Sequence, residues 1–148
     1  MYKNLLVPTD GSKLSDKAVK EAITLAQGLG AGITLYYAVP DYPDPVYMES
    51  AMLAAYVPPD QYRADATRQA TKVLTRAAAK VEAAGLSAQT LHNLSNVPWE
   101  GIIAAATKKK CDLIVMASHG RRGIAGVLLG SETQKVLTHS KVPVLVVR

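Results

Sequence analysis

The segment ASHGRRGIAGVLLGS, residues 117–131, combines residue types that bind anions in proteins. Gly120 and Gly130 lie ten residues apart, an arginine pair follows the first glycine, and Ser131 follows the second. Glycine allows a ligand to approach the backbone closely, and arginine neutralises negative charge. An apolar run leads into the segment and a helical pattern leads out of it. Because the N–H groups at a helix N-terminus attract anions, this arrangement indicates a phosphate site.

The same residues have a purely structural interpretation. Ser131 is a favourable N-cap, and Gln134, three residues later, completes a capping-box pattern. Thr133 adds a second hydroxyl in the first turn, and Gly120 would then only turn the chain. The spacing alone therefore leaves phosphate binding and helix capping as equal alternatives.

Asp10 and His119 are further candidates for contact with a ligand. Asp10 follows an apolar strand expected over residues 4–9. A carboxylate there is placed to hold a ribose hydroxyl, or a Mg²⁺ ion that bridges phosphates. Capping of the next helix, together with Ser12, is the equal alternative for Asp10. His119 lies inside the glycine-rich segment, where its ring is placed to contact a ligand.

The sequence does not indicate other chemistry. It has no GxxxxGK[ST] motif, which excludes a Walker-type phosphate loop. His92, His119 and His139 lack metal-ligand spacing, and no Ser-His-Asp or Cys-His arrangement is recognisable. Cys111 precedes an apolar strand and is expected to be a small core or edge residue and not a nucleophile. Because no base besides Asp10 is placed to activate water, no catalytic residue is assigned.

Alternating strand and helix patterns must position these residues. In chain order we predict strand 4–9, helix 15–30, strand 32–39, helix 61–84, strand 87–94, helix 97–109, strand 112–118, helix 131–140 and strand 142–147. Segment 40–59 contains five prolines and is predicted to be irregular, with one helical turn at 48–56; a lid, a partner surface and an ordinary loop all fit it.

Strands separated by helices pair in parallel through right-handed crossovers. The sequence therefore predicts an α/β fold in a single domain: an open, doubly wound, parallel five-stranded sheet of Rossmann-like architecture. Ligands of such sheets bind at the carboxyl ends of the strands. Asp10 and the glycine-rich segment follow the first and fourth strands, so we expect them to meet at that edge.

The composition is that of one ordinary domain of 148 residues, with 49% hydrophobic and 20% charged residues. No apolar run approaches the ~20 residues that span a bilayer, and the N-terminal residues do not resemble a signal peptide, so a cytoplasmic protein without membrane contact is expected. The net charge is +5, but aromatic residues make up only 5% of the chain. That scarcity disfavours stacking on single strands, and no nucleic-acid partner is expected.

Two stretches of the chain resemble the universal stress protein family, and the resemblance extends over residues 1–148. The opening YKNLLVPTDGSKLSDKAVKEAITLA is similar to the family's first strand and helix, and the tail from DLIVMASHG onward is similar to its C-terminal half. The family's nucleotide motif is G-x2-G-x9-G-(S/T). Here it reads Ala117, Gly120, Gly130 and Ser131, with alanine in place of the first glycine.

The resemblance implies strand order 3-2-1-4-5 and a site for ATP, with Mg²⁺ accompanying the nucleotide near Asp10. It implies that the adenosine side of the site is lined by Pro8, Thr9 and Asp10, and that the adenine edge contacts Ala38. The floor below the ribose would be formed by Met116 and Ala117. The phosphates would be held by His119, Gly120, Gly130 and Ser131, with Glu132 and Thr133 beside them. It also implies a homodimer through the C-terminal strand 142–147, an apolar edge strand that would otherwise be exposed to aggregation.

The resulting functional hypothesis is a small dimeric ATP-binding protein of stress response or signalling with little catalytic activity. Two alternatives remain at this point. One is an enzyme that uses the same pocket, as a slow ATPase or an ATP-dependent transferase. The other is a dimeric interaction protein that binds no nucleotide, which the alanine at position 117 keeps open.

Overall fold

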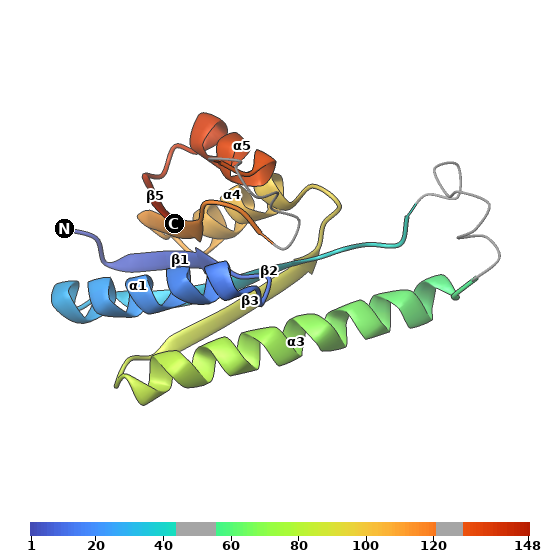
Figure 1. The fold of residues 1–148 in the computed structure, drawn as a ribbon, viewed down its shortest axis with the longest axis horizontal. Coiled ribbons are helices and arrows are strands. Elements are labelled where there is room, and N and C mark those ends of the chain that lie inside the picture. The colour runs from blue at the N-terminus through green and yellow to red at the C-terminus, as the bar shows by residue number, and fades with distance from the viewer. Residues whose placement is uncertain (44–55, 121–128) are drawn as a thin grey trace.

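The structure, a computed structural model, describes residues 1–43, 56–120 and 129–148 (Figure 1). The arginine pair at 121–122 lies outside the described residues. So does the helical turn predicted at 48–56, apart from Tyr56, which is in no helix.

Nine elements follow one another in the described chain. They are β1 (Asn4–Pro8), α1 (Lys13–Leu29), β2 (Gly32–Val39), α3 (Pro59–Ala83), β3 (Ala88–Leu94), α4 (Pro98–Lys108), β4 (Leu113–Ala117), α5 (Ser131–His139) and β5 (Val144–Val147). Every element was predicted, and each boundary lies within two residues of the prediction. The sequence patterns therefore identified the elements correctly.

The strands form a five-stranded sheet in the order β3-β2-β1-β4-β5, and all of its neighbours are parallel. This confirms the predicted α/β class and strand order. Leu5 of β1 pairs with Ile33 of β2 on one side and with Leu113 of β4 on the other. The direction of chain progression reverses between β1 and β4, which makes this position the switch point where ligands of such sheets bind.

Helices cover both faces of the sheet, as Figure 1 shows. One apolar core joins the sheet to α1 and α3 and contains Leu5 and Val7 of β1. The other joins the sheet to α4 and α5 and contains Leu6. Because β1 and β4 are covered on both faces, their residues are continuously apolar instead of alternating.

Residues at the helix ends explain where α1 and α4 begin and stop. The Ser12 side chain caps α1 by accepting a hydrogen bond from the Ser15 N–H at 3.2 Å, and Gly30 ends the helix with φ 65°. Pro98 occupies the first turn of α4, as predicted, and the helix ends within the lysine run at Lys108. In the described ranges, no helix has the length and apolar character needed to cross a membrane.

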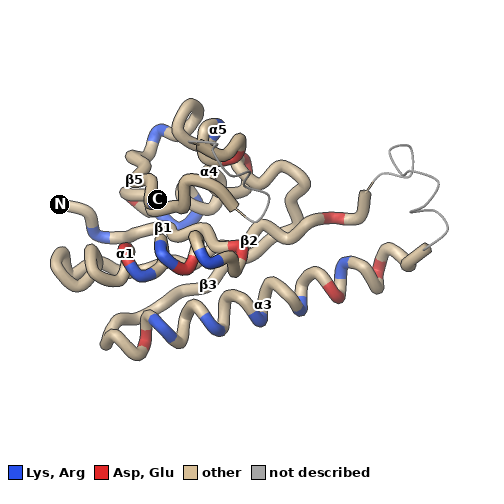
Figure 2. Tube along the Cα trace, in the orientation of Figure 1, with Lys and Arg blue, Asp and Glu red and all other residues tan. Residues whose placement is uncertain are grey.

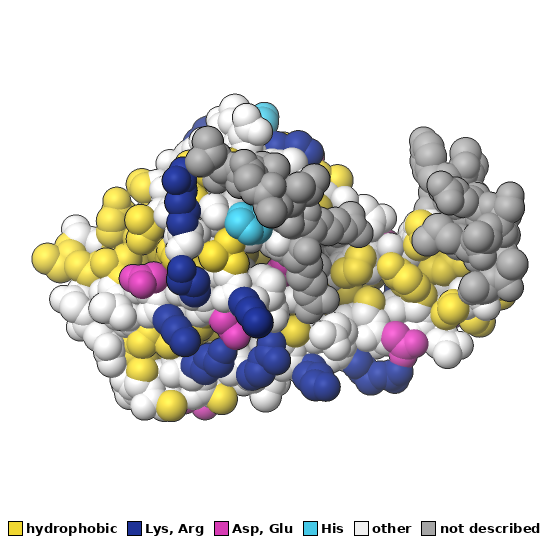
Figure 3. All heavy atoms as spheres, in the orientation of Figure 1, with side chains coloured by type: hydrophobic (Ala, Val, Ile, Leu, Met, Phe, Trp, Pro, Cys, Tyr) yellow, Lys and Arg dark blue, Asp and Glu magenta, His cyan; other side chains and the backbone are white. Residues whose placement is uncertain are grey.

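The surface charge is unevenly distributed. Lys and Arg gather on the outer surfaces of α1 and α3 (Figures 2 and 3). The edge strand β5 carries exposed apolar surface instead, with 42% of Leu145 accessible. These two surfaces lie outside the cores that hold the sheet and its helices together.

Candidate functional site

A cavity of about 610 Å³ lies where the carboxyl ends of β1, β2 and β4 meet the N-terminus of α5. All twelve residues that the sequence assigned to a nucleotide site line it: Pro8, Thr9, Asp10, Ala38, Met116, Ala117, His119, Gly120, Gly130, Ser131, Glu132 and Thr133. They come from separate segments of the chain, and the strand order brings them together.

Eight further residues line the cavity and were missed: Ser15, Tyr36, Tyr37, Pro40, Ser95, Asn96, Pro98 and Ile102. They lie in α1, in or just after β2, just after β3, and in α4. The expected strand order, with β3 beside β2, carried a signal for Ser95 and Asn96, because both directly follow β3.

The turn after β1 forms one wall of the site. Oδ1 of Asp10 accepts a hydrogen bond from the Ser12 N–H at 2.9 Å, and Ser12 caps α1. The hydroxyls of Thr9 and Ser15 lie 3.1 Å apart in the buried base of the turn. Asp10 therefore stabilises the turn that precedes the Ser12 cap, and does not itself take the N-cap position that one of its two predicted roles implied. Its other oxygen, Oδ2, faces Gly120, because a Cβ added to Gly120 would lie 2.7 Å from it.

The N-terminus of α5 forms the opposite wall. Gly130, not Ser131, is the N-cap, and no side chain caps the helix, so the capping-box alternative for Ser131 and Gln134 was wrong. The first backbone hydrogen bond of the helix runs from the Gln134 N–H to the Gly130 carbonyl. The N–H groups of residues 131–133 precede this bond and have no acceptor within the helix. A helix N-terminus of this kind attracts an anion.

Gly130 is required by close packing. Its N–H donates to the Ser118 carbonyl at 2.7 Å, which holds the start of α5 against the end of β4. A Cβ at this position would lie 3.0 Å from both Cα and Cβ of His119. Because φ is −70°, the backbone conformation does not require glycine here. The requirement comes from the close packing against His119.

Two side chains in the first turn of α5 are already engaged. The Thr133 hydroxyl donates to the Ala117 carbonyl at 2.9 Å and is buried, so its proton is used by the fold. A carboxylate oxygen of Glu132 accepts from the Trp99 N–H in the first turn of α4 at 2.8 Å. Glu132 thus satisfies the Trp99 N–H at the N-terminus of α4, whereas no side-chain cap is present at the N-terminus of α5 among the described residues.

Replacing Thr133 with valine should lower the free energy of unfolding by about 1–2 kcal/mol, because the buried bond to Ala117 is lost while the shape is retained. Urea denaturation would measure the loss. Thr138→Val is the matched control, because the Thr138 hydroxyl makes its hydrogen bond to Gln134 on the exposed side of the same helix. An equal loss in both variants would contradict a special role for the buried bond.

The floor of the cavity is formed by the end of β4. Met116 and Ala117 are buried, with 5% and 7% of their surface accessible. His119 is half-buried beyond them, and its Nδ1 lies 3.2 Å from the Ser118 hydroxyl. The floor is therefore apolar, and polar groups stand at its rim.

The rim on the β2 side is tied to α3. Asn96 accepts a hydrogen bond from the Asp41 N–H at 3.0 Å, and Asp41 forms an ion pair with Arg63 of α3 at 2.6 Å. The hydrogen bond from the Arg63 guanidinium holds the pKa of Asp41 below its usual value. This cluster links the rim residue Asn96 to the layer of helices on the other face.

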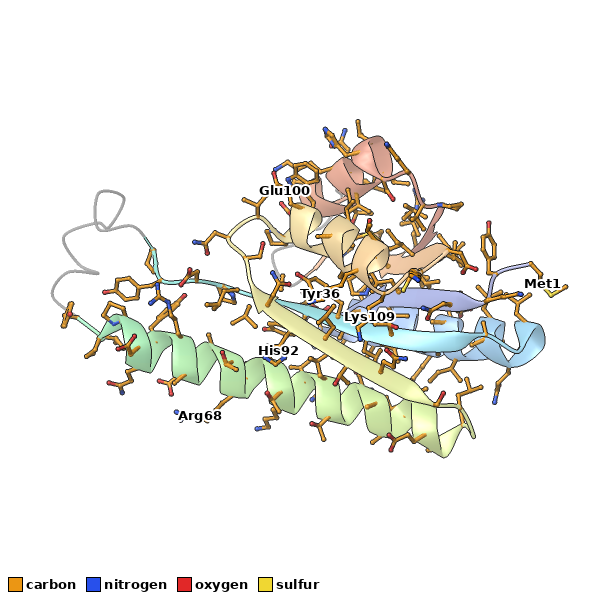
Figure 4. The ribbon with its side chains drawn as sticks, turned by 180° about the vertical axis from the view of Figure 1, so that it is seen from behind. Met1, Tyr36, Arg68, His92, Glu100 and Lys109 are labelled. Carbon is orange, nitrogen blue, oxygen red and sulfur yellow. The ribbon has the colours of Figure 1, made fainter. Side chains whose placement is uncertain are left out.

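Tyr36 forms the inner wall between β2 and α4 (Figure 4). Only 1% of its surface is accessible, and its hydroxyl donates to Oδ1 of Asn93 at 2.7 Å. Burial raises the pKa of Tyr36 to about 12. A Cβ on Gly101 of α4 would lie 2.2 Å from the Tyr36 hydroxyl, so α4 can approach only because position 101 has no side chain.

The Tyr36 pKa predicts a loss of stability at high pH. The folded state keeps the Tyr36 proton up to a pKa of about 12, whereas the unfolded chain releases it near the ordinary value of 10.0. The folded state therefore binds more protons between these values, and stability should fall as the pH rises through that window. Urea denaturation of wild type and Tyr36→Phe at several pH values would measure it. The difference in free energy of unfolding between wild type and Tyr36→Phe should stay constant below pH 10 and change above it. A difference that is constant over the whole pH range would contradict the prediction.

No group of three or more His, Cys, Asp and Glu side chains able to hold a metal ion occurs in the part of the chain that the structure describes. A divalent ion at this site would therefore need ligands from a bound molecule as well as from Asp10. Mg²⁺ often binds in this way, through one or two carboxylates and substrate phosphates. The residues present fit such an ion only together with a phosphate ligand.

Comparison with known protein families identifies this architecture. The model of the universal stress protein family matches residues 1–148. The chain belongs to the universal stress protein family. The family assignment agrees with the sequence resemblance and with the strand order of the sheet.

Individual relatives match nearly the whole of this chain. Universal stress protein MJ0531 of Methanocaldococcus jannaschii is 32% identical over 148 residues, which cover 100% of this chain and 83% of that protein. The solved structure of MJ0577 from the same organism superposes with a TM-score of 0.82 at 26% identity and covers 99% of this chain and 96% of that one. A universal stress protein solved in complex with cAMP has a TM-score of 0.71 at 28% identity and covers 99% and 97% of the two chains.

Proposed function

We propose that the chain binds ATP in the cavity at the switch point and acts as a dimeric stress-response or signalling protein of the cytoplasm with little catalytic activity. The observation that carries this proposal is the N-terminus of α5. Its N–H groups at residues 131–133 have no acceptor within the helix, and the helix begins at a cavity lined by every residue that the family motif selected. A helix N-terminus beside a closely approaching glycine turn suits a phosphate group.

Within this proposal, the phosphates lie between α5 and the turn at Gly120. The Ser131 hydroxyl is not used as a helix cap, so it can contribute to phosphate binding. The adenosine lies over the apolar floor of Met116 and Ala117, toward Ala38. Ala117 replaces the first motif glycine, but its methyl group is already packed in the core beside α1 and α3, which supports retention of binding.

Mg²⁺ would accompany the nucleotide through the carboxylate of Asp10 and neutralise phosphate charge. The proposed lack of efficient hydrolysis follows from the engaged side chains around it. The Asp10 and Glu132 carboxylates accept backbone hydrogen bonds, and the ring of His119 lies beside the Ser118 hydroxyl. No described carboxylate or imidazole that lines the cavity stands unengaged as a base for water.

The test begins with protein purified without added nucleotide. The protein is denatured, and any released small molecule is identified by mass spectrometry. The emptied protein is then titrated with Mg-ATP by calorimetry, and light scattering on the same sample reports whether it is a dimer. Released adenine nucleotide or saturable ATP binding would support the proposal. A protein that carries no nucleotide and ignores millimolar ATP would instead support the dimeric interaction protein.

A cyclic or monophosphate nucleotide is the second candidate ligand, because the solved relative at 28% identity holds cAMP. Titration with cAMP and AMP beside ATP would rank the three ligands. Tighter binding of cAMP than of ATP would place the chain among sensors of a signalling nucleotide, and would overturn the choice of ATP while retaining the site.

A further inference from the structure

The outer surfaces of α1 and α3 together form a basic face. We define it by eight residues: Lys13, Lys17, Lys20, Arg68, Lys72, Arg76, Lys80 and Arg148. These are nearly half of the 17 Lys and Arg residues in the chain. Figure 3 shows many Lys and Arg side chains on the viewed side of the molecule, with few acidic side chains between them.

The spacing within each helix aligns the positive charges. Lys13, Lys17 and Lys20 lie four and three residues apart on α1, opposite its buried residues, so they share the outer side of that helix. On α3, cationic residues recur every four positions from Arg68 to Lys80, with no acidic residue in between. The row on α3 extends over about 18 Å, at 1.5 Å per residue.

Contacts between the helices hold the two rows side by side. Lys80 of α3 forms an ion pair with Asp16 of α1 at 3.0 Å. Arg76 donates to the Gly11 carbonyl at 3.3 Å, in the turn before α1. Lys17 donates to the carbonyl of Arg148, which extends the face to the end of the chain. Figure 2 shows the two rows along neighbouring helices.

Most of these charges are not neutralised by the fold. Arg68 pairs with Asp65 and Lys80 with Asp16. The other six form no ion pair with any described residue, and all six are exposed: Lys13, Lys17, Lys20, Lys72, Arg76 and Arg148. Of the two acidic residues in α1, Asp16 pairs with Lys80, and Glu21 is the other. Keeping so many like charges together costs folding energy, which favours a polyanionic partner.

The lack of large exposed apolar residues on α1 and α3 indicates which class of polyanion fits the basic face. The large exposed apolar residues are Met1, Tyr2, Tyr56, Val57, Leu94, Val97, Leu137 and Leu145. None of them lies on α1 or α3. A membrane-surface helix needs an apolar side to insert among lipids, and single strands need aromatic rings for stacking. Attraction to closely spaced phosphates needs neither, and duplex nucleic acid carries one negative charge per about 1.7 Å of its axis.

We propose that the basic face binds the phosphate backbone of double-stranded nucleic acid without reading its sequence. The sequence-based argument against nucleic acids concerned stacking on single strands and does not apply to this surface. The proposal is independent of ATP binding, because none of the eight residues lines the cavity.

The test uses fluorescein-labelled DNA duplexes of random sequence, about two helical turns long, and fluorescence anisotropy at several salt concentrations. We expect a dissociation constant in the micromolar range at low salt. The slope of log K against log salt should approach about −5 if each of the six unpaired cations neutralises one phosphate. Lys13→Gln/Lys20→Gln/Lys72→Gln should weaken binding about tenfold or more and reduce the slope by about half.

Lys108→Gln/Lys109→Gln/Lys141→Gln is the matched control, because it removes the same charge outside the basic face. Figure 4 labels Arg68 of α3, in the basic face, and Lys109, the C-cap residue of α4, outside it. The control should bind the duplex nearly as well as wild type, and circular dichroism checks that both variants fold. Equal weakening in both variants would overturn the proposal, because net charge alone would explain it. Absence of duplex binding, or binding only to vesicles rich in phosphatidylserine, would overturn it as well.

Discussion

Gly130→Asp is expected to lower the affinity for Mg-ATP by at least about a hundredfold, equivalent to about 2.7 kcal/mol. The new carboxylate would stand at the N-cap of α5, where an aspartate side chain accepts hydrogen bonds from the first-turn N–H groups. These are the N–H groups that we propose for the phosphates. An internal anion would therefore occupy the phosphate site and repel the ligand. Calorimetric titration of both proteins with Mg-ATP measures the change.

The backbone allows this substitution, but the packing opposes it. Gly130 has φ −70° and ψ 152°, which aspartate adopts without strain, and an N-cap aspartate stabilises a helix by only about a few tenths of a kcal/mol relative to glycine. Crowding against His119, where a Cβ would lie 3.0 Å from both Cα and Cβ, is expected to outweigh that gain, so circular dichroism must first show that the variant folds. Gly28→Asp is the control, because a Cβ there meets nothing within 4 Å and Gly28 lies in α1, outside the cavity. Unchanged ATP affinity in folded Gly130→Asp would contradict the phosphate site at α5.

Gly101→Ala is expected to lower the free energy of unfolding by about 1–3 kcal/mol. Alanine ordinarily stabilises a helix interior relative to glycine by about 1 kcal/mol. Here the added methyl would lie 2.2 Å from the Tyr36 hydroxyl, and the tyrosine is too deeply buried to move aside. Overpacking therefore outweighs helix propensity. Urea denaturation measures the loss.

Tyr36→Phe should rescue this variant. Without the hydroxyl, the nearest atoms to the new methyl are Tyr36 Cζ and the Ser95 hydroxyl oxygen, both at 3.3 Å, which small shifts accommodate. The double-mutant cycle should give a coupling energy of about 2 kcal/mol between positions 36 and 101. Gly28→Ala, a helical glycine with open space around it, should not destabilise the protein. A cost for Gly101→Ala that is the same in both backgrounds would contradict the clash.

The secondary structure was predictable because its signals are local. The run LIVMA of β4 is apolar at every position, and all five residues are buried beneath helices on both sides. Ala18, Ala22 and Ala26 recur every four residues and form part of the buried side of α1. Pro98 marks the start of α4 and Gly30 the end of α1. Such patterns act within one or two turns, so no tertiary information was needed.

The candidate site was predictable as a set of residues but not in its internal bonding. The motif selected Gly130 and Ser131, and the family resemblance placed Thr133 beside them. The helix begins one residue earlier than the capping-box pattern implied, because Gly130 packs against residues 118–119 and takes the N-cap position. Thr133 turns its hydroxyl to the carbonyl of Ala117, 16 residues earlier. Neither contact can be predicted from the spacing of residues along the chain.

The sequence by itself determined the elements, the α/β class and the glycine-rich segment that joins β4 to α5, because hydrophobic periodicity and glycine or proline positions act over a few residues. Only the tertiary structure decided which groups face one another. It placed Tyr36 against Gly101, Glu132 at the start of α4, and the lysines of α1 beside the cationic row of α3. These contacts join residues far apart in the chain, and their partners are selected by packing across the sheet and not by local preference.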